Sequence, residues 1–223
     1  MGRIRRLVQT SVGAKMVMGL TGLALFLFVI VHLLGNLNLL RGREAMNGYA
    51  AGLQGMPAVL WPARIGLLAI FFTHIAFAVR LTRENRRARP EHYRHEDTVQ
   101  ATWASRHMLL TGAVVGAFVV YHLLHFTFHV VPTGAIETVD GRPDVYGMVV
   151  NAFSNGWIVA SYVVAQVLLG LHLIHGSRSL FQSMGWDQAV LRPLVHVVAP
   201  ALAIFVAAGN ILLPLSVLFG WLC

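Results

Sequence analysis

The chain has 223 residues, of which 57% are apolar and 12% charged, about half the charged fraction of a soluble globular domain. The formal net charge is +8, but the charges form short clusters between long apolar runs. This pattern is typical of the loops of a membrane protein and disfavours a nucleic-acid-binding face. The single cysteine, Cys223, excludes disulfide frameworks, iron–sulfur ligation by this chain and covalent haem attachment.

Five apolar stretches are long enough to cross a bilayer as helices, which takes about 20 residues each. The first is too long for the apolar region of a removable signal peptide. The polar segment 80–106 is expected as a solvated loop or a short surface helix. The prediction is an all-α integral membrane bundle of five transmembrane helices, a single membrane domain over residues 1–223, with spans at about 17–40, 61–80, 107–131, 154–177 and 196–222.

Orientation follows from the distribution of Lys and Arg, which concentrate on the cytoplasmic side. With a cytoplasmic N-terminus, the inner segments 1–16, 80–106 and 177–195 hold 4, 7 and 2 basic residues, 13 of the 17 in the chain. The outer side keeps four. We therefore expect the N-terminus in the cytoplasm and, after five spans, the C-terminus outside.

An internal repeat relates the first and third spans. Thr21-Gly22 precedes His32-Leu33-Leu34 by the same nine residues that separate Thr111-Gly112 from His122-Leu123-Leu124, and Phe28 and Phe118 are in register. Spans two and four share a weaker echo, His74-x3-Ala78-x-Arg80 and His172-x3-Gly176-x-Arg178. Spans one–two and three–four are predicted to be parallel repeats, with chance similarity between Leu/Val-rich helices as the alternative.

Histidine is the characteristic ionisable residue of the spans, which contain no Asp, Glu or Lys. Ionisable groups inside a bilayer are costly and usually functional. Imidazole without carboxylate favours a metal or haem over a proton-driven transporter. The histidines concerned are His32, His74, His122, His125, His129, His172 and His175, with His196 at the start of the fifth span.

Depth indicates which histidines can pair. At about 1.5 Å per residue, His32 and His122 lie roughly 22 Å above the inner surface, in the outer half of the membrane. His74 and His172, on descending spans, fall in the inner half. Two levels with two histidines each suit two bis-histidine haems, which carry electrons because the iron has no open position. The alternative is that these histidines form hydrogen bonds between helices. His125 and His175 remain rivals for ligation, since each lies three residues from its neighbour.

Two further pairs of residues accompany the histidines. Gly22 and Gly112 lie about 15 Å below His32 and His122, near the inner level, where a glycine would let a porphyrin approach or would serve helix packing. Arg80 and Arg178 follow the inner histidines by six residues. They are candidates for contacts with haem propionates or for ordinary snorkelling at the membrane boundary.

Nearly the whole chain resembles the single-chain, five-helix, di-haem cytochrome b subunit of succinate dehydrogenases and fumarate reductases. The resemblance is carried by Ser11-Val-Gly-Ala-Lys15 through Thr21-Gly22, by His32-Leu-Leu-Gly-Asn36 with Arg41 to Asn47, and by His175-Gly-Ser-Arg through Trp186. It implies one haem ligand from each of the first four helices, and by motif these are His32, His74, His122 and His172. This agrees with the depth argument, which assigns His32 and His122 to an outer haem b and His74 and His172 to an inner one.

The resemblance also implies partners and a role. These are a flavoprotein subunit that oxidises succinate, an iron–sulfur subunit, membrane lipid, and a quinone (menaquinone or ubiquinone) that accepts electrons in a bacterial cytoplasmic membrane. A fumarate reductase subunit working in the reverse direction is the nearest alternative. A haem-free structural anchor is the alternative from another class. Glu44 and Gln54 align with no glutamate of the fumarate-reducing relatives well enough to carry over a role in quinone binding.

Overall fold

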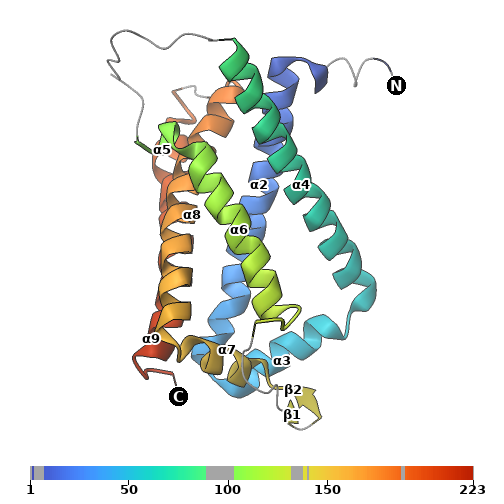
Figure 1. Ribbon diagram of the computed structural model, residues 1–223, viewed down its shortest axis with the longest axis vertical. Coiled ribbons are helices and arrows are strands. Elements are labelled where there is room, and N and C mark those ends of the chain that lie inside the picture. Colours follow the sequence, from blue (N-terminus) through green and yellow to red (C-terminus); the bar gives the residue numbers. More distant parts are fainter. Residues whose placement is uncertain are drawn as a thin grey trace.

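The computed structural model describes residues 2, 8–88, 103–131, 138–139, 141–186 and 189–222. The described elements are helical apart from one two-residue β pairing, and five helices are long and apolar enough to cross a membrane. These helices run along the long axis of the molecule (Figure 1). The predicted all-α bundle with five spans is confirmed.

The five spans are built from long helices, the fifth with an irregular start. They are α2 (Ser11–Asn36), α4 (Pro57–Arg87), α6 (Met108–Phe126), α8 (Gly156–Ser183) and α9 (Ala199–Leu218). A turn of π-helix, η2 (Leu194–Val198), leads directly into α9. Helix α2 packs against α4, α8 and α9, whereas α6 packs chiefly against α8.

Shorter elements connect the spans. At the end of the bundle where α9 finishes lie η1 (Leu37–Arg41), α3 (Arg43–Gln54), the β1 (Thr138–Val139) and β2 (Arg142–Pro143) pair, and α7 (Val145–Phe153) (Figure 1). The strands are antiparallel, with Thr138 opposite Pro143 and Val139 opposite Arg142. The four-residue α5 (Trp103–Arg106) precedes α6 near the opposite end, where α2 begins and α4 finishes. We call the end where α2 begins and α4 finishes the inner end, and the end where α9 finishes the outer end.

Helices α4 and α6 do not end where the apolar runs predict. Helix α4 continues to Arg87, and the Nε of Arg80 lies 2.7 Å from Glu84 Oε1 one turn later, a pairing that supports a helix beyond the apolar run. Helix α6 stops at Phe126, short of the expected residue 131. His129 adopts a left-handed conformation with φ of 53° and lies outside the helix in which it was expected.

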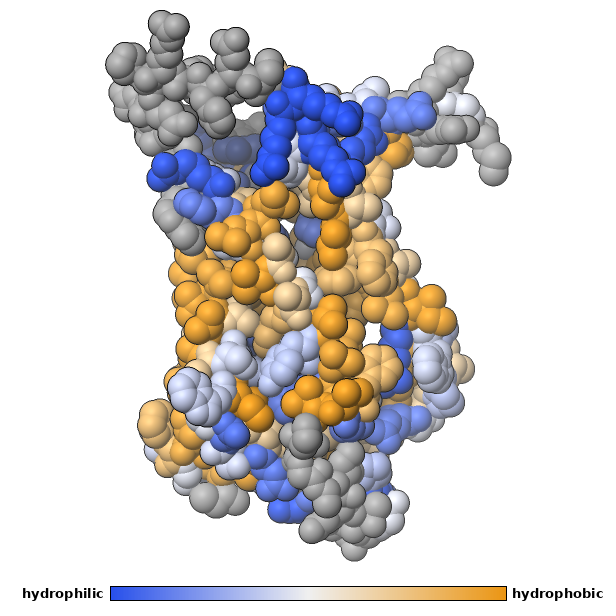
Figure 2. All heavy atoms as spheres, viewed as in Figure 1, coloured by the Kyte–Doolittle hydropathy of each residue, from blue (hydrophilic) through white to orange (hydrophobic). Residues whose placement is uncertain are grey.

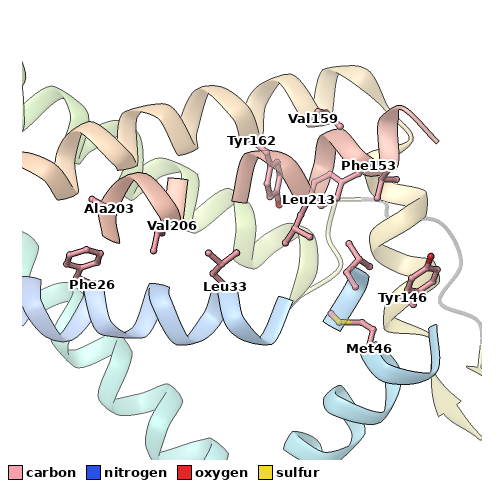
Figure 3. Close-up of a cluster of buried hydrophobic side chains, with 12 residues drawn as sticks. Phe26, Leu33, Met46, Tyr146, Phe153, Val159, Tyr162, Ala203, Val206 and Leu213 are labelled. Atoms are coloured by element: carbon pink, nitrogen blue, oxygen red, sulfur yellow. The ribbon is translucent and has the colours of Figure 1, made fainter. Parts of the chain in front are cut away.

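The core lies where α2, α8 and α9 meet, and it extends to α3 and α7 (Figure 3). Leu33 of α2 is fully buried and packs over Gly209 of α9, where a Cβ atom would lie 2.7 Å from Leu33 Cδ2. A Cβ on Gly170 of α8 would lie 2.9 Å from Ala207 Cβ on α9. Small residues thus let these helices approach closely, as is usual for helices packed within membranes.

On the face shown in Figure 2, apolar residues cover the middle of the molecule and polar residues gather towards its ends. Along α4, large apolar side chains are exposed; these are Val59, Trp61, Ile65, Leu68, Phe72 and Ile75. So much exposed apolar surface matches a hydrocarbon environment and would be unfavourable in water. The chain is a multi-pass membrane protein.

Candidate functional site

The structure brings the four predicted ligands together as two pairs. The ring centroids of His32 on α2 and His122 on α6 are 5.8 Å apart, with an interplanar angle of 86°. Those of His74 on α4 and His172 on α8 are 6.5 Å apart, at 75°. We call them the outer pair and the inner pair. Each pair takes its members from helices that do not follow one another in the chain.

The two pairs lie at different depths. His74 contacts Thr21 of α2, eleven residues before His32 on the same helix. His172 contacts Thr111 of α6, eleven residues before His122. At about 1.5 Å per residue, the two levels are therefore roughly 16 Å apart along the helices.

On the inner level, His74 is held by the first turns of α2. Its Nδ1 lies 3.0 Å from the carbonyl oxygen of Met18 and 3.2 Å from Thr21 Oγ1. The Thr21 hydroxyl itself lies 2.7 Å from the carbonyl of Val17, to which it donates. Gly22 leaves room for the ring, since a Cβ there would lie 3.0 Å from His74 Cε1.

His172 is held in the same way by α6. Its Nδ1 lies 3.3 Å from Thr111 Oγ1. The Thr111 hydroxyl lies 3.1 Å from the carbonyl oxygen of Met108 and 3.2 Å from that of His107. A Cβ on Gly112 would lie 3.3 Å from His172 Cε1. The two Thr-Gly sequences of the internal repeat thus contact the two inner histidines.

The outer pair has aromatic neighbours. Phe28 stacks on His32 with centroids 5.5 Å apart, and Phe118, its counterpart in the repeat, lies 5.9 Å from His122. The hydroxyl of Tyr162 on α8 lies 3.3 Å from His122 Nδ1 and 3.0 Å from His125 Nδ1. Tyr162 is 5% exposed and belongs to the core cluster.

The rival histidines occupy other positions. His125 is 0% exposed and binds Tyr162, and its Nε2 has no hydrogen-bond partner among the described residues. The ring that faces His74 is that of His172, three residues before His175. His196 lies in the π-helical turn η2 and is exposed. Sequence reasoning named all of these histidines but missed Tyr162.

The two arginines after the inner histidines differ in their contacts. Besides Glu84, the guanidinium of Arg80 donates to the carbonyl oxygens of Val8 at 3.0 Å and Gln9 at 2.6 Å. It therefore ties the end of α4 to the segment before α2. The buried Nε of Arg178 has no hydrogen-bond partner within the described part of the chain.

The centroid separations of both pairs fit two imidazoles that hold one metal ion between them. A metal–imidazole bond of about 2 Å, with the ring centre about 1 Å further out, places two such centres about 6 Å apart. Among the residues that the structure describes, no group of three or more His, Cys, Asp or Glu side chains converges, so each pair offers two protein ligands. Two axial nitrogens suit haem, whose porphyrin supplies the other four, better than zinc, which takes four protein ligands in structural sites.

The fold and the site together define a multi-pass membrane protein with two pairs of half-buried histidines, each pair in T-shaped ring contact between two helices. Comparisons with protein-family models, curated proteins and solved structures found no match for the chain.

Proposed function

We propose that the chain is the membrane-anchor cytochrome b subunit of a succinate:quinone oxidoreductase in a bacterial cytoplasmic membrane. His32 and His122 would hold the outer haem b, and His74 and His172 the inner one. Haem in these positions supplies reversible one-electron transfer. The partners would be a flavoprotein subunit and an iron–sulfur subunit at the inner end, with menaquinone or ubiquinone as the substrate in the membrane.

The observation that carries the proposal is the pairing itself. Four histidines from four different helices form two pairs, and both centroid separations, 5.8 and 6.5 Å, suit bis-imidazole iron. Helix–helix hydrogen bonding alone would not require two imidazole rings from different helices to lie beside each other twice. The buried Nε of Arg178, which has no hydrogen-bond partner among the described residues, adds a place for an anionic group such as a propionate. The family resemblance supplies the partners and the substrate.

Haem content and pairing test the proposal together. The purified complex should contain two haem b per chain by pyridine haemochrome assay, with the flavoprotein and iron–sulfur subunits co-purifying. His32→Ala and His122→Ala should each lose the same haem, and His74→Ala and His172→Ala the other, because a porphyrin is gripped by two histidines at one depth. Potentiometric titration of the remaining haem identifies which one is lost.

His125→Ala and His175→Ala are the matched controls, since each lies within one turn of a proposed ligand. Both should retain two haems. A wild-type haem content near zero would support a haem-free anchor instead. Loss of the same haem by the His32 and His74 variants would contradict the pairing by depth. Among assembled variants, loss of haem from His175→Ala but not from His172→Ala would reassign that ligand.

A further inference from the structure

We infer that Thr21-Gly22 and Thr111-Gly112 form two corresponding contact sites, here called seats, for the rings of His74 and His172. Each seat fixes which ring nitrogen of its histidine faces the iron. The two threonines are then positioning residues for the inner haem. This inference rests on the proposed function, because it takes the inner pair to be haem ligands.

The argument begins with the proton on His74. The carbonyl oxygen of Met18, 3.0 Å from Nδ1, can only accept a hydrogen bond, so Nδ1 carries the proton. The Thr21 hydroxyl donates to the carbonyl of Val17 and turns a lone pair towards the same N–H, 3.2 Å away. With its proton on Nδ1, a neutral imidazole has its free lone pair on Nε2, the nitrogen available to a metal.

The second seat repeats this arrangement with fewer acceptors. The Thr111 hydroxyl donates to a main-chain carbonyl, that of Met108 or His107. Because its one hydrogen is then used, we infer that it accepts from His172 Nδ1, 3.3 Å away. Among the residues that the structure describes, Nδ1 of His172 contacts the Thr111 hydroxyl alone, whereas Nδ1 of His74 also contacts the Met18 carbonyl. Thr111 should therefore matter more to its histidine than Thr21 does.

The glycines complete each seat by admitting the ring. A Cβ would lie 3.0 Å from Cε1 of His74 at position 22 and 3.3 Å from Cε1 of His172 at position 112. Both distances are tighter than ordinary contacts, so an alanine would push the ring away from its threonine. The same two residue types touch the same ring atoms at two places in the molecule, and these places are related by the internal repeat. Plain helix packing explains the glycines but not the hydroxyl beside each Nδ1.

The seats have an electronic consequence. A hydrogen bond from Nδ1–H to an oxygen acceptor makes the imidazole a more basic ligand and stabilises the oxidised metal. Replacing threonine by valine keeps the shape and removes the acceptor. Thr111→Val should therefore raise the midpoint potential of the inner haem, Thr21→Val should raise it less, and neither should move the outer haem.

The experiment is redox titration and electron paramagnetic resonance of the purified, haem-loaded complex carrying Thr111→Val, Thr21→Val or Thr111→Ser. The inner haem is the one that His74→Ala loses. Thr111→Ser should restore the wild-type potential and spectrum, because serine keeps the hydroxyl. Thr73→Val is the control. Thr73 directly precedes His74, but its hydroxyl donates to the Ala69 carbonyl, so its removal should change neither haem.

Two haems with wild-type potentials and spectra in Thr111→Val would overturn the inference and leave the proposed function standing. A shift confined to the outer haem, or a shift in Thr111→Ser as large as in Thr111→Val, would also overturn it. If Thr111→Val fails to assemble, Thr21→Val is judged by the same criteria. In that variant His74 still has the Met18 carbonyl as a hydrogen-bond acceptor, so we expect the protein to assemble. A wild-type protein without haem would instead refute the proposed function.

Discussion

Tyr162 joins two histidines on the outer level, where a phenol takes the place that a threonine holds on the inner one. If His122 donates Nδ1–H to the phenol oxygen, the phenol proton is free to reach Nδ1 of His125. His125 is fully buried, so the tyrosine provides the hydrogen bond that this ring would otherwise lose to burial. His122, the proposed ligand of the outer haem, and the buried His125 are thereby linked through the side chain of Tyr162.

Tyr162→Phe should shift the midpoint potential of the outer haem and leave the inner one unchanged. It should also lower the thermal midpoint of the purified protein, because leaving a buried polar group unpaired costs about 1–3 kcal/mol. Tyr121→Phe is the matched control: its ring centroid lies 5.9 Å from that of Tyr162 and the substitution removes the same atom. An equal effect of both substitutions would contradict a specific role for the Tyr162 hydroxyl.

At this scale the sequence indicates depth well and rotation poorly. Depth follows from counting residues along a helix, and His32, His122, His74 and His172 pair in the structure as that count predicts. The rotation of a helix about its own axis cannot be predicted by counting residues, because the lipid-facing and core-facing sides of a membrane helix are both apolar. Tyr162 lies ten residues before His172, about 15 Å along α8 and hence on the outer level. Its depth was available from the sequence, but the direction of its side chain was not.

Helices α3 and α7 are tied together by Asp144, the residue that caps α7. Its carboxylate pairs with Arg43 and accepts hydrogen bonds from Asn47 Nδ2 at 2.9 Å and from the Gly147 amide at 3.1 Å. Asn47 Oδ1 in turn accepts from the Tyr146 amide at 2.9 Å. Asp144 is 3% exposed, and among the described residues its carboxylate is bonded from both helices.

The pKa of Asp144 should make this junction sensitive to acid. Burial acts to raise that pKa, but the hydrogen bonds from Asn47 and Gly147 and the Arg43 guanidinium outweigh it, so the pKa lies below its usual range. A carboxyl with a depressed folded-state pKa stabilises the fold fully above its unfolded pKa of about 4, and this stabilisation is lost as the pH falls through the folded value.

Asp144→Asn should therefore lower the thermal midpoint at pH 7 and weaken the further loss of stability on acidification. Thermal unfolding of the detergent-purified protein at pH values from 7 down to about 3 measures both effects. Glu44→Gln, an exposed carboxylate in the first turn of α3, should change neither. Parallel acid curves for the wild type and the Asp144 variant would refute this role.

Hydropathy locates spans more reliably than it locates helices. It finds the five apolar runs because the bilayer requires them, but α3 and α7 lie between the predicted spans, where no helix was predicted. These helices are stabilised by contacts between distant segments, such as the Arg43–Asp144 pair across 101 residues, and no local pattern reports such contacts. The same applies to α4, whose last two turns are helical although the apolar run has ended.

On the scale of the whole molecule, the two ends of the bundle differ in charge. The last turns of α4 carry Arg80, Arg83, Arg86 and Arg87, and we expect this end to face the cytoplasm. A phosphatase fused after Arg89 should be inactive, and a fluorescent protein fused there should fluoresce. Phosphatase fused after Gly55, which follows α3 at the outer end, should be active. The reverse pattern would invert the orientation and exchange the inner and outer haems.

Both halves of the internal repeat contribute residues to the site. Each histidine pair takes one member from the first half of the chain, on α2 or α4, and one from the second half, on α6 or α8. Neither half contains a complete site, and α6 packs chiefly within its own half. An iron bound by both members of a pair would cross-link the two halves. Haem binding and the association of the two halves would then be thermodynamically linked. Haem loading would then report directly that the two halves have come together in the correct register.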